Sequence, residues 1–70
     1  MFDKQEFAAN LRAARARLDM TQAEFARRAG ISVPTIVEYE SGDGFVPGVD
    51  KIAAMCRVLD ISPNDLLGWK

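Results

Sequence analysis

Apolar residues recur along the chain at the three- and four-residue spacing of amphipathic helices. We expect two such stripes to face the core. Their members are Phe7, Leu11, Ala14 and Leu18 in the first stripe, and Val49, Ile52, Cys56 and Leu59 in the second, with Met55 beside it. No segment alternates apolar and polar residues with the period of two that a half-buried strand needs. The pattern therefore predicts an all-α fold.

Capping residues divide the chain into five predicted helices. A side-chain oxygen just before a helix can accept a hydrogen bond from an amide two or three residues later, so Ser, Thr and Asp mark helix starts. Residues of this kind are Asp3, Thr21, Ser32 and Ser62, and Gly30 and Gly68 mark helix ends. The expected helical segments run from Asp3 to Asp19, from 22 to 29, from about 33 to 40, from about 49 to 59, and from Ser62 to Gly68.

The second and third predicted helices are separated by only three residues, Gly30-Ile31-Ser32. So short a connection makes the two helices cross at roughly 90–120°. The sequence supplies what this crossing needs: the small Ala26 at the contact, Gly30 for a left-handed turn, and Ile36 to pack back against the second helix. The spacing predicts a helix-turn-helix, with the helix after the turn held outside the core.

Length and composition limit the possible functions. Seventy residues make one domain, here 1–70, and 49% hydrophobic residues are too many for a disordered chain. With one Cys and no His, we expect no disulfide, no metal, no cofactor and no enzyme, and Cys56 is expected to be a buried thiol. Residues 1–6 contain no apolar stretch typical of a signal peptide, and no run approaches the roughly 18 apolar residues that span a bilayer. A cytoplasmic protein is expected.

The charges are unevenly distributed. The net charge is −1, whereas a nucleic-acid-binding domain is usually basic. Residues 1–30 contain six Lys and Arg and four acidic residues, while residues 31–70 contain three Lys and Arg and six acidic residues. Screening limits the reach of each charge to about 8–10 Å, so a basic face can bind phosphate on an acidic molecule.

Taken together, these features resemble the phage-repressor and Cro-like (XRE-type) helix-turn-helix family. The resemblance covers Leu11 to Leu67 and is carried by Leu11-Arg12, Met20 to Ala26, Gly30 to Ser32, Thr35-Ile36, Tyr39 to Gly42, and Ile61 to Leu67. It implies a five-helix, lambda-repressor-like domain that binds double-stranded DNA as a homodimer. In this family the third helix lies in the major groove with its first residues towards the bases.

The resemblance also implies roles for particular residues. It places Gln22 on a phosphate, and Thr35 on a phosphate or a base. The full set of implied DNA contacts is Gln22, Ser32, Val33, Pro34, Thr35, Val37 and Glu38. Arg15 and Glu40 match positions that form a salt bridge between the first and third helices of similar domains.

Some of these positions depart from the family pattern. Val33 and Pro34 replace residues that often hydrogen-bond to bases, and an apolar group can at best pack on a thymine methyl. Glu38 could accept a hydrogen bond from cytosine N4, but it would also repel phosphates. The loop from Ser41 to Gly48 has no Lys or Arg. We therefore expect a modest affinity with a shallow dependence on salt.

Three classes of function remain at this point. The favoured one is a sequence-specific transcriptional regulator, expected to repress by occupying a palindromic operator as a dimer; an antitoxin would have the same fold. The second is a protein-interaction module with weak or no DNA binding, which net acidity and exposed Val33 and Val37 would favour. An enzyme is the least favoured. Phe45, Val46 and Trp69 are expected either to cover the core or to form a dimer interface.

Overall fold

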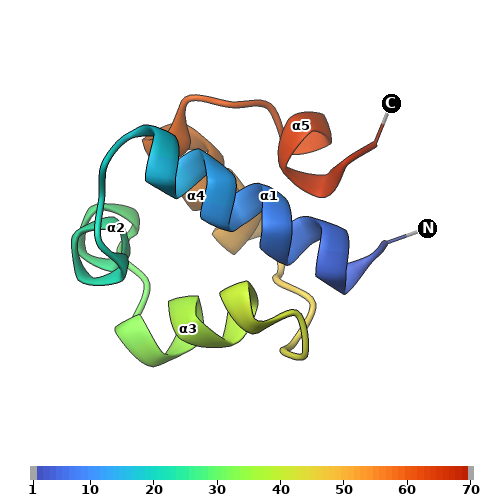
Figure 1. The fold of residues 1–70 in the computed structure, drawn as a ribbon, viewed down its shortest axis with the longest axis horizontal. Coiled ribbons are helices and arrows are strands. Elements are labelled where there is room, and N and C mark those ends of the chain that lie inside the picture. Colours follow the sequence, from blue (N-terminus) through green and yellow to red (C-terminus); the bar gives the residue numbers. More distant parts are fainter. Residues whose placement is uncertain (1, 70) are drawn as a thin grey trace.

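The computed structural model describes residues 2–69, which fold into five helices with no strand among them. The helices are α1 (Lys4–Arg17), α2 (Gln22–Ala29), α3 (Val33–Ser41), α4 (Val49–Leu59) and α5 (Pro63–Leu67). α1 packs against α3 on one side and α5 on the other, and α2 packs against α3 and α4 (Figure 1). The predicted all-α, five-helix class is confirmed.

The expected capping residues begin the helices. Asp3 accepts hydrogen bonds from the amides of Gln5 and Glu6, and the side chains of Thr21, Ser32 and Ser62 each accept one from the amide three residues later. Each cap satisfies an amide that has no partner inside the helix, and is worth about 1 kcal/mol. α3 continues to Ser41, one residue beyond its expected end, because the left-handed residue that terminates it is Gly42.

The core is formed where the five helices meet. Seven large side chains are almost completely buried: Phe7, Leu11, Phe25, Ile36, Met55, Leu59 and Leu66. Every helix contributes to this set, so no helix can leave without exposing apolar surface. Burying a side chain of this size stabilises the fold by about 1.5–3 kcal/mol. The predicted burial of Cys56 is confirmed.

For two residues of the apolar stripes, the prediction that they face the core is wrong. Leu18 is 42% exposed, because α1 ends at Arg17 and Asp19 adopts a left-handed φ of 62° that turns the chain away. Met20, just after this turn, is buried instead. Val49 is 87% exposed, because it is the first residue of α4 and the helix reaches the core only from Ile52 onwards.

Of the two alternatives for Phe45, Val46 and Trp69, the one in which they cover the core is also wrong. Phe45 is 77% exposed, and Val46 and Trp69 are exposed as well. The chain between α3 and α4 is instead anchored by the buried Pro47. No helix among residues 2–69 is long and apolar enough to cross a membrane.

Candidate nucleic-acid interface

A left-handed residue joins α2 to α3. Gly30 has a φ of 69°, and the amide of Ile31 then donates to the carbonyl of Ala26 at 3.0 Å. A Cβ at Gly30 would meet nothing within 4 Å, so glycine is favoured here for its backbone conformation and not for space. Ile31 is buried beneath the turn, and Ser32 begins α3 two residues after the elbow.

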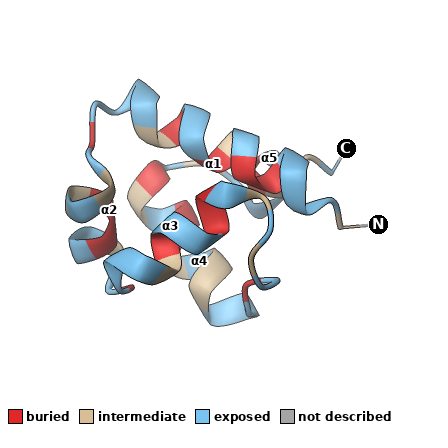
Figure 2. Cartoon of the chain, turned by 60° about the horizontal axis from the view of Figure 1, so that its bottom comes forward, coloured by how far each residue is buried: buried red, intermediate tan, exposed pale blue. Residues whose placement is uncertain are grey.

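α3 has one buried and one exposed side. Ile36, Tyr39 and Glu40 face the interior, and Ile36 is fully buried. Val33 and Val37 are 40% and 46% exposed. Pro34 and Glu38 are exposed too, so these four predicted contact residues share the outer side (Figure 2).

The two hydroxyl-bearing residues at the start of α3 contact each other. The oxygens of Ser32 and Thr35 lie 2.8 Å apart, and the Ser32 oxygen also accepts the Thr35 amide at 3.4 Å. Ser32 is exposed and Thr35 is half-buried. Each hydroxyl has a donor and two acceptor positions, so both keep some capacity for a further hydrogen bond.

A buried ion pair fixes the far end of α3. Arg15 Nε donates to Glu40 Oε2 at 2.7 Å, and Arg15 Nη2 donates to Glu40 Oε1 at 2.9 Å. Arg15 Nη1 also donates to the carbonyl of Met20 at 2.7 Å. The Glu40 side chain is only 3% exposed. The pKa of the Arg15 guanidinium is raised, mainly because of its hydrogen bond with Glu40. This bidentate pair joins α1 to α3.

Two further residues from other helices bind Glu40, and the sequence analysis missed both contacts. Gln22 Nε2 at the start of α2 donates to Glu40 Oε1 at 3.1 Å, and Arg12 Nη1 on α1 donates to the Glu40 carbonyl at 2.6 Å. The Gln22 amide has two N–H groups, so one is used within the protein and the other can still donate to a further acceptor. Arg12 satisfies a carbonyl at the end of α3. No local spacing could have indicated these contacts, which span 18 and 28 residues.

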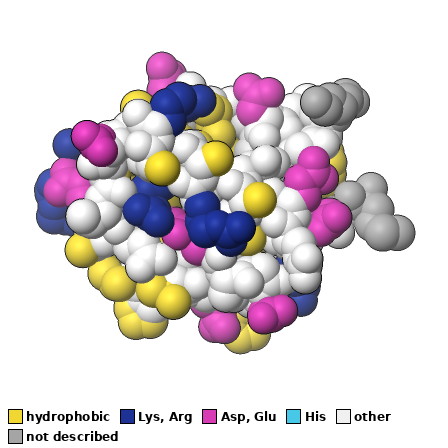
Figure 3. Space-filling model, viewed as in Figure 1, with side chains coloured by type: hydrophobic (Ala, Val, Ile, Leu, Met, Phe, Trp, Pro, Cys, Tyr) yellow, Lys and Arg dark blue, Asp and Glu magenta, His cyan; other side chains and the backbone are white. Residues whose placement is uncertain are grey.

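Positive charge is scarce along α3 and the loop that follows it, apart from Arg12 and Arg15 of α1, which bind Glu40 at the end of α3. Residues 33–48 contain no Lys or Arg but three acidic residues, Glu38, Glu40 and Asp43. On α2, Arg27 and Arg28 both bind Glu24, at 2.8 and 2.7 Å, and these hydrogen bonds lower the pKa of Glu24. Hydrophobic side chains gather over the beginning of α3, at the lower left of Figure 3. The outer side of α3 is therefore apolar at its start and acidic further along.

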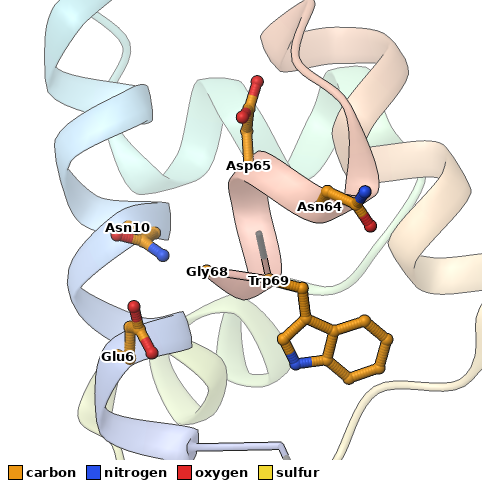
Figure 4. A pocket seen from close by; sticks show the side chains of 6 residues that line it. All are labelled: Glu6, Asn10, Asn64, Asp65, Gly68 and Trp69. Carbon is orange, nitrogen blue, oxygen red and sulfur yellow. The ribbon is translucent and has the colours of Figure 1, made fainter.

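A polar pocket of about 130 Å³ lies between α1 and α5 (Figure 4). Its lining residues are Glu6, Asn10, Asn64, Asp65, Gly68 and Trp69. None of them is a predicted DNA contact, and α1 separates this pocket from α3 (Figure 1). Within residues 2–69, no group of three or more His, Cys, Asp and Glu side chains could hold a metal ion.

A family model described as helix-turn-helix matches residues 11–66, which include the whole α2–α3 pair. The chain belongs to the helix-turn-helix family. The resemblance to phage-repressor and Cro-like domains is thereby confirmed, and this helix-turn-helix domain is a DNA-binding regulator. No curated protein matches the chain.

Solved structures share the fold of this helix-turn-helix domain. The restriction-modification controller protein C.AhdI from Aeromonas hydrophila is 26% identical with a TM-score of 0.84, covering 91% of this chain and 96% of its own. The SOS-response transcriptional repressor LexA from Eubacterium rectale is 30% identical with a TM-score of 0.81, covering 96% of this chain and 72% of its own.

An enzyme contains the same fold as one part of a longer chain. Hydroxypropylphosphonic acid epoxidase from S. wedmorenis is 24% identical with a TM-score of 0.84, covering 94% of this chain but 35% of the epoxidase. At this identity the likeness shows only the fold. The family match and the regulators outweigh it, and they point away from catalysis.

Proposed function

We propose that this helix-turn-helix domain represses transcription by binding a near-palindromic operator as a homodimer. The observation that carries the proposal is the two-sided α3, whose inner side is fixed by Ile36 and Glu40 while Val33 and Val37 stay exposed. A symmetric dimer presents two such helices about 34 Å apart, one turn of DNA, and so binds two related half-sites. Occupying the operator excludes polymerase.

The contacts follow from the position of each residue. Val33, Pro34, Val37 and Glu38 on the outer side of α3 meet base edges in the major groove. Gln22 donates its second amide N–H to a phosphate, beside the unpaired amides of the first turn of α2. Ser32 and Thr35 lie beside the same groove and donate to a phosphate or a base.

Self-association needs apolar surface outside α3. Phe45, Val46, Val49 and Trp69 are exposed apolar side chains that belong to no part of the core. They are the candidates for the dimer contact, which sedimentation of Phe45→Ala and the parent chain would test. The similarity to a controller protein and to a transcriptional repressor supports the regulatory role. The proposal places the protein in the cytoplasm, with no catalytic activity and no cofactor.

Selection of bound sites from a random duplex library, followed by sequencing, tests this function. We expect enrichment of paired half-sites with centres about one DNA turn apart. Val37→Asp should abolish enrichment, while Leu18→Asp, an apolar-to-acidic change at a residue of similar exposure outside α3 and outside the proposed dimer contact, should not. No enrichment, together with no gel shift at about 100 µM protein in about 50 mM salt, would contradict DNA binding, since even non-specific binders reach about 10⁻⁴–10⁻⁶ M. That result would favour the protein-interaction module.

A further inference from the structure

Building on the proposed function, we infer that α3 selects its operator through the C5-methyl groups of pyrimidines. Four exposed side chains lie on the outer side of its first two turns, and three of them are apolar, Val33, Pro34 and Val37, while the fourth is Glu38. In the major groove, the C5-methyl group of thymine is the one apolar feature that a standard base presents. The ligand chemistry that this surface fits is therefore a methylated pyrimidine, either thymine or 5-methylcytosine.

Guanine and adenine find none of their usual charged or amide partners on α3. Guanine presents two acceptors and is read by Arg or Lys, but residues 33–48 contain neither. Adenine presents an acceptor beside a donor and is read by Asn or Gln, which residues 33–48 also lack. The Ser41 hydroxyl donates to the Glu38 carbonyl at 2.6 Å and accepts the Asp43 amide at 3.1 Å. That hydroxyl is therefore engaged within the protein.

The spacing of the valines suits two methyl groups on one strand. Val33 and Val37 are four residues apart on α3, which corresponds to a rise of about 6 Å. Stacked bases follow each other every 3.4 Å or so, so two base steps span about 7 Å. The distance between the two valines along α3 therefore matches the distance between methyl groups on bases two steps apart.

Glu38 distinguishes the two sources of the methyl group. It follows Val37 directly and is exposed on the same side of α3. A carboxylate accepts a hydrogen bond from the N4 amino group of cytosine, which lies beside C5, whereas thymine presents the acceptor O4 at that place. Where Glu38 faces the same base as Val37, 5-methylcytosine satisfies both side chains and thymine satisfies only the valine.

Modified operators test this inference on the duplex obtained by site selection. Each thymine is replaced by deoxyuridine, which removes only the methyl group, and each cytosine by 5-methylcytosine, which adds only that group. We expect at least one single replacement in a half-site to change Kd about fourfold, which corresponds to the free energy of burying one methyl group. Two such replacements together should change Kd about 15-fold, which corresponds to two buried methyl groups. Fluorescence anisotropy titrations give these ratios.

Matched variants assign the effect to α3. In Val37→Ala, the base replacement that affects the parent chain should change Kd by less than about 1.5-fold. Leu18→Ala, at a similarly exposed residue outside α3 and outside the proposed dimer contact, should keep the fourfold ratio. Glu38→Gln should reduce any preference for 5-methylcytosine over thymine. If the operator is bound specifically but no replacement changes Kd beyond about 1.5-fold, the inference is wrong and the proposed function stands. If selection yields no operator at all, both are wrong.

Discussion

Replacing Arg15 with methionine should remove a large part of the stability of the domain. The change leaves the Glu40 carboxylate, 3% exposed, with only the neutral Gln22 amide as a side-chain donor. Losing one partner of a buried pair costs about 3–5 kcal/mol. At about 0.05–0.15 kcal/mol per residue, a chain of 70 residues has a total stability of about 3.5–10 kcal/mol. Arg15→Met therefore removes at least about 30% of the free energy of unfolding.

Thermal and urea denaturation followed by circular dichroism measure this loss. At about 4–8 °C per kcal/mol for a domain of this size, Tm should fall by at least about 12 °C. Glu40→Leu should cost a similar amount, but the double variant should recover much of it, because two apolar groups can replace a buried ion pair. Arg28→Met, which breaks the surface pair with Glu24, is the matched control and should change Tm little.

Two results would refute this reasoning. One is an Arg15→Met variant no less stable than Arg28→Met, which would mean that the ion pair between Arg15 and Glu40, 2.7 Å long, contributes nothing to stability in solution. The other is a double variant whose loss equals the sum of the two single losses, because a coupled pair must give a non-additive cycle. The ordinary pKa of arginine lies far above neutrality, and the pair with Glu40 raises the pKa of Arg15 further. The contribution of Arg15 to the free energy of unfolding should therefore not change with pH near neutrality.

Further predictions concern the elbow, the DNA contacts and the buried thiol. Gly30→Ala should lower the free energy of unfolding, measured by urea denaturation, by about 1–2 kcal/mol, because residue 30 has a left-handed φ. Gly30→Asn should lower it less, and equal stability of the parent chain and both variants would contradict this. Gln22→Ala should weaken binding to every duplex about equally, while Glu38→Ala should change which sites are selected. Burial raises the pKa of the Cys56 thiol, so its contribution to stability is full below the unfolded thiol pKa and is lost as the pH rises towards the higher folded value. Tm should therefore fall as the pH rises above the ordinary thiol pKa of about 8.5, and Cys56→Ala should show a shallower fall.

The sequence predicted the fold well because its information is local. Thr21, Ser32 and Ser62 act through amides three residues away, and Gly30 acts through its own φ. Such features depend little on the rest of the chain, so spacing alone locates the elbow and the helices on either side of it. The exposed side of α3 follows in turn from the helical period and the position of Ile36.

The remaining features depend on where helices stop and what they meet. Leu18 and Val49 fit the apolar period but lie at helix ends, beyond the part that packs. Arg12 and Gln22 bind Glu40 through the tertiary arrangement of three helices, which no spacing encodes. The predicted contact residues on α3 can be placed on its surface from the helical period, whereas the bases that they meet are set by the DNA and not by any spacing in the chain.

The shortage of cations around α3 has a consequence inside the cell. Attraction of Lys and Arg to phosphates lets regulators slide along DNA of unrelated sequence. Residues 33–48 contain no Lys or Arg that could supply this attraction. Unless the arginines of α1 and α2 supply this attraction, we expect unrelated sequences to hold the protein only briefly, so that it searches by repeated encounters from solution. We then expect most copies to stay free, and occupancy of the target to follow the amount of protein synthesised almost directly.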